Sequence, residues 1–328
     1  MTAKISDIAK LAGISSASVS RILNKTGRYS EETAKKVHKI AEEIGYYKDI
    51  SASNLASQKS STIGIIYTTL NTNFSNIVVD AIVSTATMNH FDTIMMQSKK
   101  DDANDLDQVC QRMMERRVFS ILFVSIRPTA KTIQLLNNLG IVSLLVGTAS
   151  PLSTPYISSN DYQIGFQATQ FLLDRGYQKI GFAGADTTTD FVRRQRYSGY
   201  LAALKQASVR FSQDWKFDGD FSYDAGIQAA TYYCHHQDLH AIIAASDEVS
   251  WGMLNGFQDR GVNVPEQIAI LSIDGTDSCL RTRPKLSSVT QNFELMGKTA
   301  IEYLLQSPKN RKSKVFIPFR IDPRNTTR

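Results

Sequence analysis

Short apolar runs alternate with amphipathic stretches over most of the chain, from residue 63 to residue 273. Each run has the length of one buried strand, and the stretches between the runs have the spacing of helices that cover a sheet. This alternation is typical of parallel sheets with helices on both faces. The expected strands are residues 63–67, 93–96, 119–124, 141–146, 179–183, 241–245 and 268–273.

The strands form two series, which predict two lobes. The first series ends at residue 146 and the second begins at residue 179. We expect helices between the strands at residues 105–118, 192–208, 222–237 and 247–261. Ligands of open α/β sheets bind beyond the carboxyl ends of the strands, so residues that directly follow the runs are candidates for a binding site. They are Thr68, Ser125, Gly147, Gly184, Ser246, Asp247 and Asp274.

The N-terminal stretch has a different pattern, that of three short helices around a small core. Ile8 and Leu11 are placed on one face of a first helix, which ends at Gly13. Ser15 can cap a second helix, whose apolar residues recur three and four positions apart. A third helix is predicted between the cap Ser30 and a stop at Gly45.

The outer face of the second helix carries short hydrogen-bonding side chains and one arginine. Its residues are Ser16, Ala17, Ser20, Arg21 and Asn24. A helix pair joined through glycine, with such a face, suits the major groove of DNA, although an ordinary small helical domain has the same pattern. Residues 1–40 hold eight Lys or Arg against three acids. A basic segment of this kind is expected where a protein contacts phosphates, and a solubilising surface is the alternative.

Residues 46–62 are rich in serine and small residues and predict a linker. Residues 50–56 have the length for two helical turns if binding orders them. Leu55 would then be an apolar wedge for a minor-groove base step. A disordered tether is the alternative.

Composition restricts the class of protein. The chain has no apolar run long enough to cross a bilayer, and its first residues, MTAKISDIAK, lack the apolar core of a secretory signal. We therefore expect a cytoplasmic protein that does not enter the membrane. Cys110, Cys234 and Cys279 are odd in number and far apart, which argues against a disulfide framework.

Enzyme motifs are absent from the sequence. There is no Walker loop and no HExxH pattern. One cluster could hold a metal, but it lacks the paired spacing of a zinc site and is better interpreted as a solvated helix end. Its residues are Cys234, His235, His236 and His240. Asp186 and Asp190, near Arg193 and Arg194, indicate a charged cleft rim. We therefore predict no catalytic residue, no bound metal and no cofactor.

Six motifs resemble those of the lactose-repressor/galactose-repressor family of bacterial transcriptional regulators. They are DIAKLAGISSASVSRILN at 7–24, YSEETAKKV at 29–37, GYYKDISASNLA at 45–56, DFVRRQRYSGY at 190–200, ASDEVSWG at 245–252 and SIDGTD at 272–277. With the tail PFRIDPRNTT, the resemblance extends over essentially the whole chain.

The resemblance implies an all-α helix-turn-helix headpiece followed by a two-lobed α/β body, built from two doubly wound parallel sheets like periplasmic sugar-binding proteins. The expected boundaries are 1–46 for the headpiece, 47–61 for the hinge, 62–159 plus 290–320 for the first lobe, and 160–289 plus 321–328 for the second lobe.

The resemblance also implies two sets of functional residues. Those expected at DNA are Ser15, Ser16, Ala17, Ser18, Ser20, Arg21, Asn24, Ser30, Thr33, Tyr46 and Leu55. Those expected at a small effector are Phe74, Ser125, Phe191, Arg196, Phe221, Asp247, Asp274 and Gln291.

Three positions depart from the family pattern. Lys48 stands where members usually have a proline, which leaves the start of the hinge less rigid. Gly147 stands where relatives often have an acid, and Ser246 where they often have an asparagine. Either the sugar differs from those of the best-known members, or other side chains supply these hydrogen bonds.

A function follows from the resemblance. It implies a homodimeric repressor of a carbohydrate-utilisation operon, bound to pseudo-palindromic operator DNA and released by a small sugar between the two lobes. The sequence shows no heptad repeat of the kind that forms tetramers, so we expect dimers. Two alternatives are a cytoplasmic sugar-binding protein that does not bind DNA and an α/β enzyme of sugar metabolism.

Overall fold

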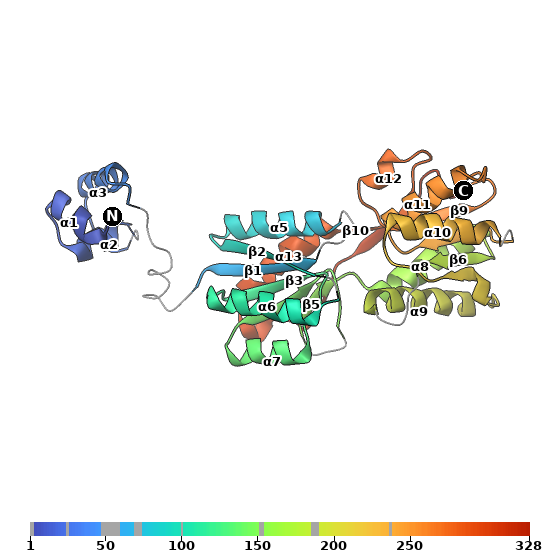
Figure 1. The fold of residues 1–328 in the computed structure, drawn as a ribbon, viewed down its shortest axis with the longest axis horizontal. Helices are drawn as coiled ribbons and strands as arrows, with labels where there is room; N and C mark the ends of the chain where they lie inside the picture. Colours follow the sequence, from blue (N-terminus) through green and yellow to red (C-terminus); the bar gives the residue numbers. More distant parts are fainter. Residues whose placement is uncertain are drawn as a thin grey trace. The chain divides into compact units, whose positions relative to one another are not determined.

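The computed structural model describes residues 3–23, 26–46, 60–68, 74–99, 101–150, 154–184, 190–235 and 238–328. The chain forms two units, Met1–Ser60 and Ser61–Arg328, whose elements are labelled in Figure 1. Within the described residues, no helix combines the length and apolar character needed to cross a bilayer. The predicted hinge, including Lys48 and Leu55, lies outside the described residues.

The first unit is a three-helix domain made of α1 (Ile5–Ala12), α2 (Ser16–Leu23) and α3 (Glu31–Glu43). The helix ends confirm the predicted signals. Gly13 ends α1 in the left-handed conformation, with φ +71°. The side-chain oxygens of Ser15 and Ser30 accept hydrogen bonds from the backbone N–H three residues on, at 3.1 and 3.2 Å.

The prediction that Leu11 shares the inner face of α1 is wrong. Its side chain is 58% exposed, whereas Ile8, Ala9 and Ala12 are buried. At 100° per residue, the buried face is centred between these three residues, and Leu11 points roughly 100° away from it. An apolar pair three residues apart was therefore insufficient to locate the core face.

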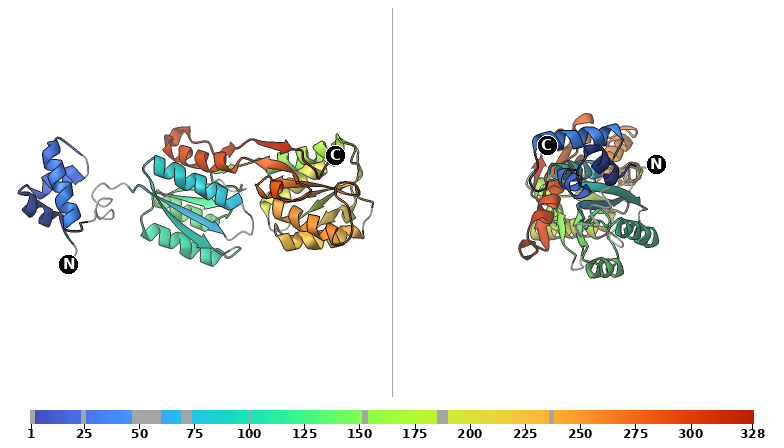
Figure 2. Two further views of the ribbon diagram at one scale, coloured as in Figure 1. Left: turned by 90° about the horizontal axis from the view of Figure 1, so that it is seen from above. Right: turned by 90° about the vertical axis from the view of Figure 1, so that its left-hand side faces the viewer.

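The first lobe of the larger unit contains a parallel six-stranded sheet in the order β11-β5-β4-β3-β1-β2. Its strands are β1 (Thr62–Thr68), β2 (Asp92–Ser98), β3 (Ser120–Val124), β4 (Val142–Val146), β5 (Tyr156–Ser158) and β11 (Lys314–Phe316). Helices α5 (Phe74–Met88) and α13 (Phe293–Leu305) cover one face of the sheet, and α6 (Ala103–Glu115) and α7 (Ala130–Asn138) cover the other. Successive residues of β3 point to opposite faces. Leu122 belongs to the buried cluster under α5 and α13, and Phe123 belongs to the cluster under α6 and α7. Figure 2 shows these helices around the sheet.

The second lobe contains a six-stranded sheet in the order β12-β10-β9-β8-β6-β7. Its strands are β6 (Ile180–Ala183), β7 (Lys216–Phe217), β8 (Ala241–Ala244), β9 (Ala269–Asp274), β10 (Ser287–Gln291) and the antiparallel edge strand β12 (Phe319–Asp322). Its helices are α8 (Asp161–Leu173), α9 (Phe191–Gln206), α10 (Tyr223–Cys234), α11 (Asp247–Gln258) and the short α12 (Ser278–Arg281). Two 3₁₀ turns, η1 (Gln213–Trp215) and η2 (Pro308–Asn310), complete the described elements of the unit.

All seven predicted strands are present, and two α/β sheets confirm the predicted fold class. The strands β5, β7, β10, β11 and β12 were not predicted, because they are short or polar, as in the sequence SSVTQ of β10. The sheets place residues 290–291 and 319–320 in the second lobe, slightly beyond the boundaries expected from the sequence.

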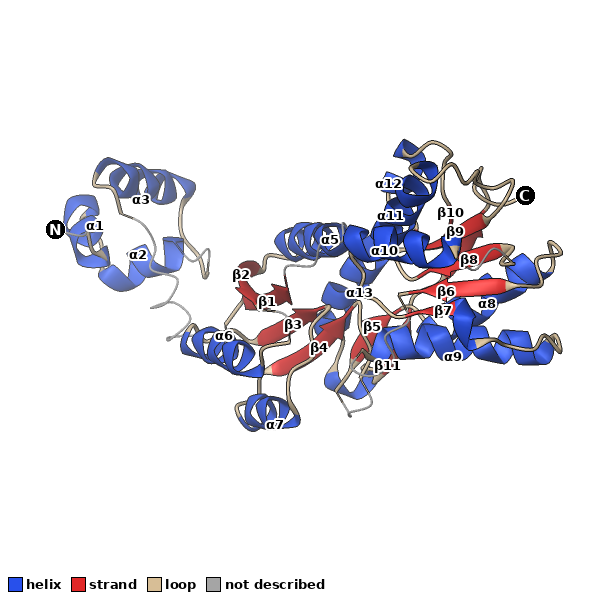
Figure 3. Ribbon diagram, turned by 45° about the vertical axis from the view of Figure 1, so that its right-hand side comes forward, coloured by secondary structure: helices blue, strands red, loops and turns tan. Residues whose placement is uncertain are grey.

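The chain passes between the two lobes three times. The crossings connect β5 to α8, β10 to α13, and β11 to β12. Figure 3 shows the two sheets on either side of these connections. Residues at the crossings can therefore contribute side chains to a site that involves both lobes.

Helices α8 and α9 approach each other closely at Gly165. A Cβ atom placed there would lie 1.8 Å from the carbonyl oxygen of Arg196. Only glycine allows this backbone contact, which fixes the distance between the two helices.

We expect Gly165→Ala to destabilise the larger unit by about 1–3 kcal/mol or more, because α9 must move away from α8. Urea denaturation followed by circular dichroism measures the loss. The exposed Gln167 on the same helix supplies the control, since Gln167→Ala should change stability by no more than about 0.5 kcal/mol. Equal stability of both variants would show that the helix contact tolerates a methyl group.

Candidate functional site

A cavity of about 310 Å³ lies between the two lobes at the carboxyl ends of the strands. Of the candidates that follow predicted strands, Thr68, Ser125, Gly147 and Asp274 line it. Gly184, Ser246 and Asp247 are not among its lining residues. The rule that ligands bind beyond strand ends therefore located the cavity, but not every residue on it.

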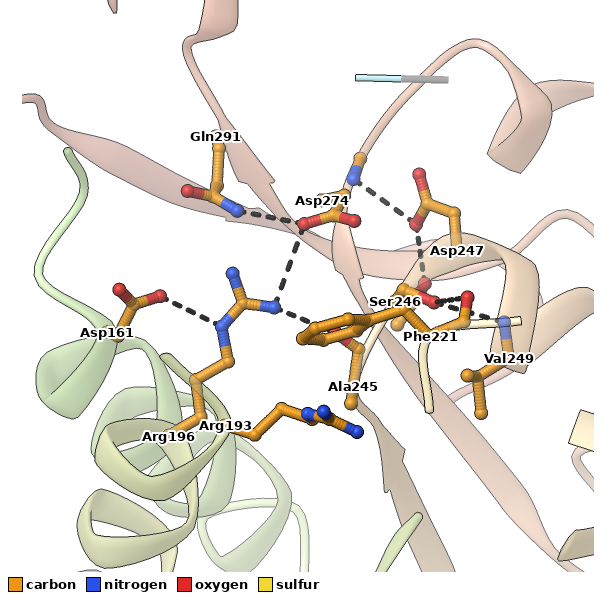
Figure 4. A network of polar contacts seen from close by, with 12 residues as sticks. Asp161, Arg193, Arg196, Phe221, Ala245, Ser246, Asp247, Val249, Asp274 and Gln291 are labelled. Carbon is orange, nitrogen blue, oxygen red and sulfur yellow. Dashed lines mark hydrogen bonds and ion pairs between the residues drawn. The ribbon is translucent and has the colours of Figure 1, made fainter. Parts of the chain in front are cut away.

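Arg196 lines the cavity and is buried, and Figure 4 shows its guanidinium among its polar partners. Its Nε donates to Asp161 Oδ1 at 2.9 Å, and its Nη1 donates to the carbonyl oxygen of Ala245 at 2.7 Å. The same Nη1 lies 3.8 Å from Asp274 Oδ1, which also accepts from Gln291 Nε2 at 2.9 Å. One cation thus joins side chains from α8, α9, β9 and β10.

Burial controls the charges in this cluster. It raises the pKa of Asp274 well above the ordinary value, and Asp247 and Glu248 add to the shift while Arg196 opposes it. Burial also raises the pKa of Asp161, again against the effect of Arg196. Burial disfavours the charge of Arg196, but Asp161 and Asp274 outweigh it and keep its pKa above the ordinary value. One buried cation, Arg196, therefore stands against two buried carboxyl groups. Asp161 forms the shorter ion pair with it, so a ligand hydroxyl can donate to Asp274.

Two residues that line the cavity have backbone conformations that side chains rarely adopt. Ser125 has φ +56° and Asp274 has φ +118°, and both lie at the carboxyl end of a strand. The buried Ser125 Oγ has no hydrogen-bond partner among the described residues. Such strained, unsatisfied positions are frequent at ligand sites.

Phenylalanines from both lobes line the cavity. Phe221 covers the guanidinium groups of Arg193 and Arg196. Its ring centroid lies 4.9 Å from Arg193 Cζ and 5.9 Å from Arg196 Cζ. Phe74 stacks on Phe293 with 4.9 Å between the ring centroids. Apolar ring faces next to buried polar groups are suitable for a sugar ring.

Ser246, where relatives often have an asparagine, holds the backbone next to Phe221. Its Oγ donates to the Phe221 carbonyl oxygen at 3.0 Å and accepts from Val249 N at 3.2 Å, which caps α11. Ser246 therefore acts on the cavity through Phe221 and not by direct contact.

Two of the eight predicted effector residues, Asp247 and Phe191, are not among the residues that line the cavity. Asp247 is 1% exposed and accepts hydrogen bonds from Ser272, Gly275, Thr276 and Cys279. These donors fill its acceptor positions, so it connects α11 to the loop after β9. Phe191 packs against the buried cluster under α6 and α7. The other six predicted residues line the cavity: Phe74, Ser125, Arg196, Phe221, Asp274 and Gln291.

Several polar lining residues were not predicted as effector contacts. They are Lys99, Asp101, Asp102, Arg127, Thr129, Thr148, Ser158 and Asp161. Most lie at strand ends or helix starts, which is the signal that would have found them. Asp190, predicted at a cleft rim, lines the cavity and caps α9 by accepting from Arg193 N at 3.0 Å. Asp186 lies outside the described residues.

The predicted DNA-reading face of α2 is accessible. Ser16, Ala17 and Arg21 are exposed. The Arg21 side chain lies along its own helix, with Nε donating to the Ala17 carbonyl oxygen at 3.4 Å and Nη2 donating to Ser18 Oγ at 3.2 Å. Both distances are long for N–H···O hydrogen bonds, so these contacts hold the Arg21 side chain only weakly.

The other residues expected at DNA have mixed environments. Ser15 and Ser30 are exposed caps, Ser18, Ser20 and Thr33 are partly exposed, and Tyr46 packs against the core of the three-helix domain. Asn24 and Leu55 lie outside the described residues.

The suspected metal cluster is only partly described. His236 lies outside the described residues, and the described ones contain no group of three or more His, Cys, Asp or Glu that could hold a metal ion.

Two family models match the chain. The model described as bacterial regulatory proteins, lacI family, matches residues 4–49, and that of a periplasmic binding protein-like domain matches residues 169–327. The chain is 30% identical to catabolite control protein A of Priestia megaterium, with 100% of each chain covered.

Solved structures have the same fold. The lac repressor dimer bound to operator and the anti-inducer ONPF is similar with a TM-score of 0.89 and 21% identity, over 100% of this chain and 99% of that chain. The regulator CCPA of Weissella paramesenteroides with bound sucrose is similar with a TM-score of 0.74 and 22% identity, over 81% of this chain and 98% of that chain.

We expect Arg196→Met to destabilise the larger unit by about 3–5 kcal/mol near neutral pH, because Asp161 and Asp274 are left buried without their cation. Arg196 lowers the pKa of both carboxyl groups in the wild type, so its removal raises them further. The folded variant then binds more protons than the folded wild type, and the loss should shrink as pH falls from 7.5 to 5.5. Urea denaturation at both pH values measures it. The exposed Arg194 on the same helix supplies the control Arg194→Met, and a loss independent of pH would contradict the charge assignment.

Proposed function

This chain belongs to the lacI family of bacterial regulatory proteins, and we propose that it represses a carbohydrate-utilisation operon and is released from its operator by a small sugar bound between the two lobes. The observation that carries the proposal is the buried cluster of Arg196, Asp161 and Asp274 in a cavity lined by both lobes. Membership of this family supports the proposal that the protein is a DNA-binding regulator that acts in the cytoplasm.

The cavity chemistry supports a polyol effector. Arg196 and Asp274 offer donors and acceptors to neighbouring hydroxyls, and Phe74 and Phe221 offer apolar faces from opposite lobes. The Weissella paramesenteroides relative was solved with sucrose, which is in keeping with this chemistry. Planar nucleobases can also lie between two phenylalanines, so they belong in any ligand screen.

The three crossings between the lobes support a mechanism of release. A ligand that contacts both lobes favours the lobe arrangement in which all of its contacts are made. In a dimer, that arrangement changes the spacing of the first lobes and raises the cost of ordering the hinge segments on DNA. The effector and the operator then bind to different states of the same protein.

Operator recognition should depend on Arg21. We expect Arg21→Ala to weaken binding to an operator selected from random pseudo-palindromic duplexes by about tenfold or more, which corresponds to ~1–3 kcal/mol for a lost base contact. A gel shift at constant salt measures the change, and thermal shifts with sugars should stay unchanged. The control Lys39→Ala removes one exposed charge from α3 and should weaken binding less. Equal losses in both variants would show that Arg21 contributes only charge.

The effector should lower operator affinity. A thermal-shift panel of mono- and disaccharides and nucleobases identifies a ligand by its selective rise in melting temperature. We expect that ligand to release the protein from operator in a gel-shift titration and to lose this effect in Arg196→Met. Tighter DNA binding with the ligand would make it a co-repressor. A ligand effect without any DNA binding by the full chain would favour the sugar-binding protein that does not act on DNA.

A further inference from the structure

We infer that the cavity between the lobes selects an uncharged polyol and excludes ligands that carry phosphate or another anionic group. This inference rests on the proposed function, which assigns a small sugar to the cavity. It narrows that assignment, because sugars and sugar phosphates share their ring hydroxyls and differ in charge.

The charges that line the cavity disfavour an anion. The described lining holds five carboxylates and three cations. The carboxylates are Asp101, Asp102, Asp161, Asp190 and Asp274, and the cations are Lys99, Arg127 and Arg196. A phosphate ester with nearly two negative charges would lie among more carboxyl groups than cations in the described lining, in a partly desolvated space where like charges repel more strongly than in water.

Three of the helices that begin at the cavity, α6, α7 and α9, are capped by side chains that line it. Free N-terminal amides are the usual backbone site for phosphate. Here Asp102 Oδ1 accepts from Asp105 N at 3.0 Å at the start of α6, and Asp190 Oδ1 accepts from Arg193 N at 3.0 Å at the start of α9. The start of α7 is capped by Thr129, whose Oγ1 accepts from Thr132 N at 3.1 Å. Two of these three caps carry a negative charge at the position that a phosphate would take.

The buried cation is also occupied. Arg196 donates to Asp161 and to the Ala245 carbonyl oxygen, and it lies beside Asp274. An anion would have to compete with two buried carboxylates for one guanidinium, whereas a hydroxyl can donate to Asp274 and leave the ion pair with Asp161 in place. The cluster therefore favours ligands that donate hydrogen bonds and disfavours ligands that bring a further negative charge.

The test uses matched probes on the full chain. Glucose and glucose 6-phosphate, sucrose and sucrose 6-phosphate, and inorganic phosphate alone are compared by thermal shift and calorimetry at constant ionic strength. We expect no phosphate-bearing probe to bind at millimolar concentration. Binding of a phosphate-bearing probe to the wild type, abolished in Arg196→Met, would overturn the inference.

Variants of the charged caps keep the test informative when no neutral probe binds. Asp102→Asn and Asp190→Asn retain a capping oxygen and remove one charge each, so we expect the double variant to gain at least about tenfold in affinity for the phosphate-bearing probes. The exposed Asp259→Asn, whose position does not line the cavity, controls for net charge and should gain nothing. If the double variant gains affinity for phosphate-bearing probes while no neutral sugar binds, the exclusion of anions is supported and the proposal of a polyol effector is contradicted. A double variant that behaves like Asp259→Asn would contradict the role of the caps.

Discussion

The arrangement of the second lobe depends on a guanidinium that is removed from water. A buried charge is costly unless other charges and hydrogen bonds compensate it. Arg196 on α9 obtains its partners from α8, from the segment after β8 and from the end of β9. None of these elements can move far without leaving the charge unpaired, so the same contacts that stabilise the lobe also hold the cavity in shape.

Close helix packing makes this pairing possible. Gly165 brings the backbone of α8 against the Arg196 carbonyl, one turn of helix after Asp161, so a side chain at this position would move the arginine away from its carboxylate partner. Stability and the shape of the cavity are therefore coupled through one pair of helices. Variants in this contact are expected to change both properties together.

Carboxylates with similar sequence contexts have different functions here. Asp247 and Asp274 both lie at or just after a buried strand. Asp247 is surrounded by donors from the loop after β9, and it holds that loop against α11. Asp274 lines the cavity, and only its Oδ1 is described as contacting Gln291 and Arg196. It therefore retains capacity to accept further hydrogen bonds. The number of donors already present, and not the residue type, distinguishes the structural carboxylate from the one available to bind.

Local patterns in the sequence determined much of this protein. Apolar runs predicted seven of the strands, and serine and glycine signals predicted the ends of the N-terminal helices. Strand ends led to Thr68, Ser125, Gly147 and Asp274. Such signals involve neighbours in the chain, which is why they are visible in the sequence. Short polar strands such as β10 lack an apolar run, so only their pairing with longer strands reveals them.

The tertiary structure decided the rest, because it depends on partners distant in the sequence. Asp161 pairs with Arg196, 35 residues away. Asp247 does not line the cavity, and its oxygens accept hydrogen bonds from donors 25 to 32 residues away. Leu11 has the spacing of a core residue, yet the way α1 packs in its three-helix domain leaves it exposed. The sequence by itself determined the elements and the edge of the sheets where the cavity lies, whereas long-range packing determined which side chains line that cavity.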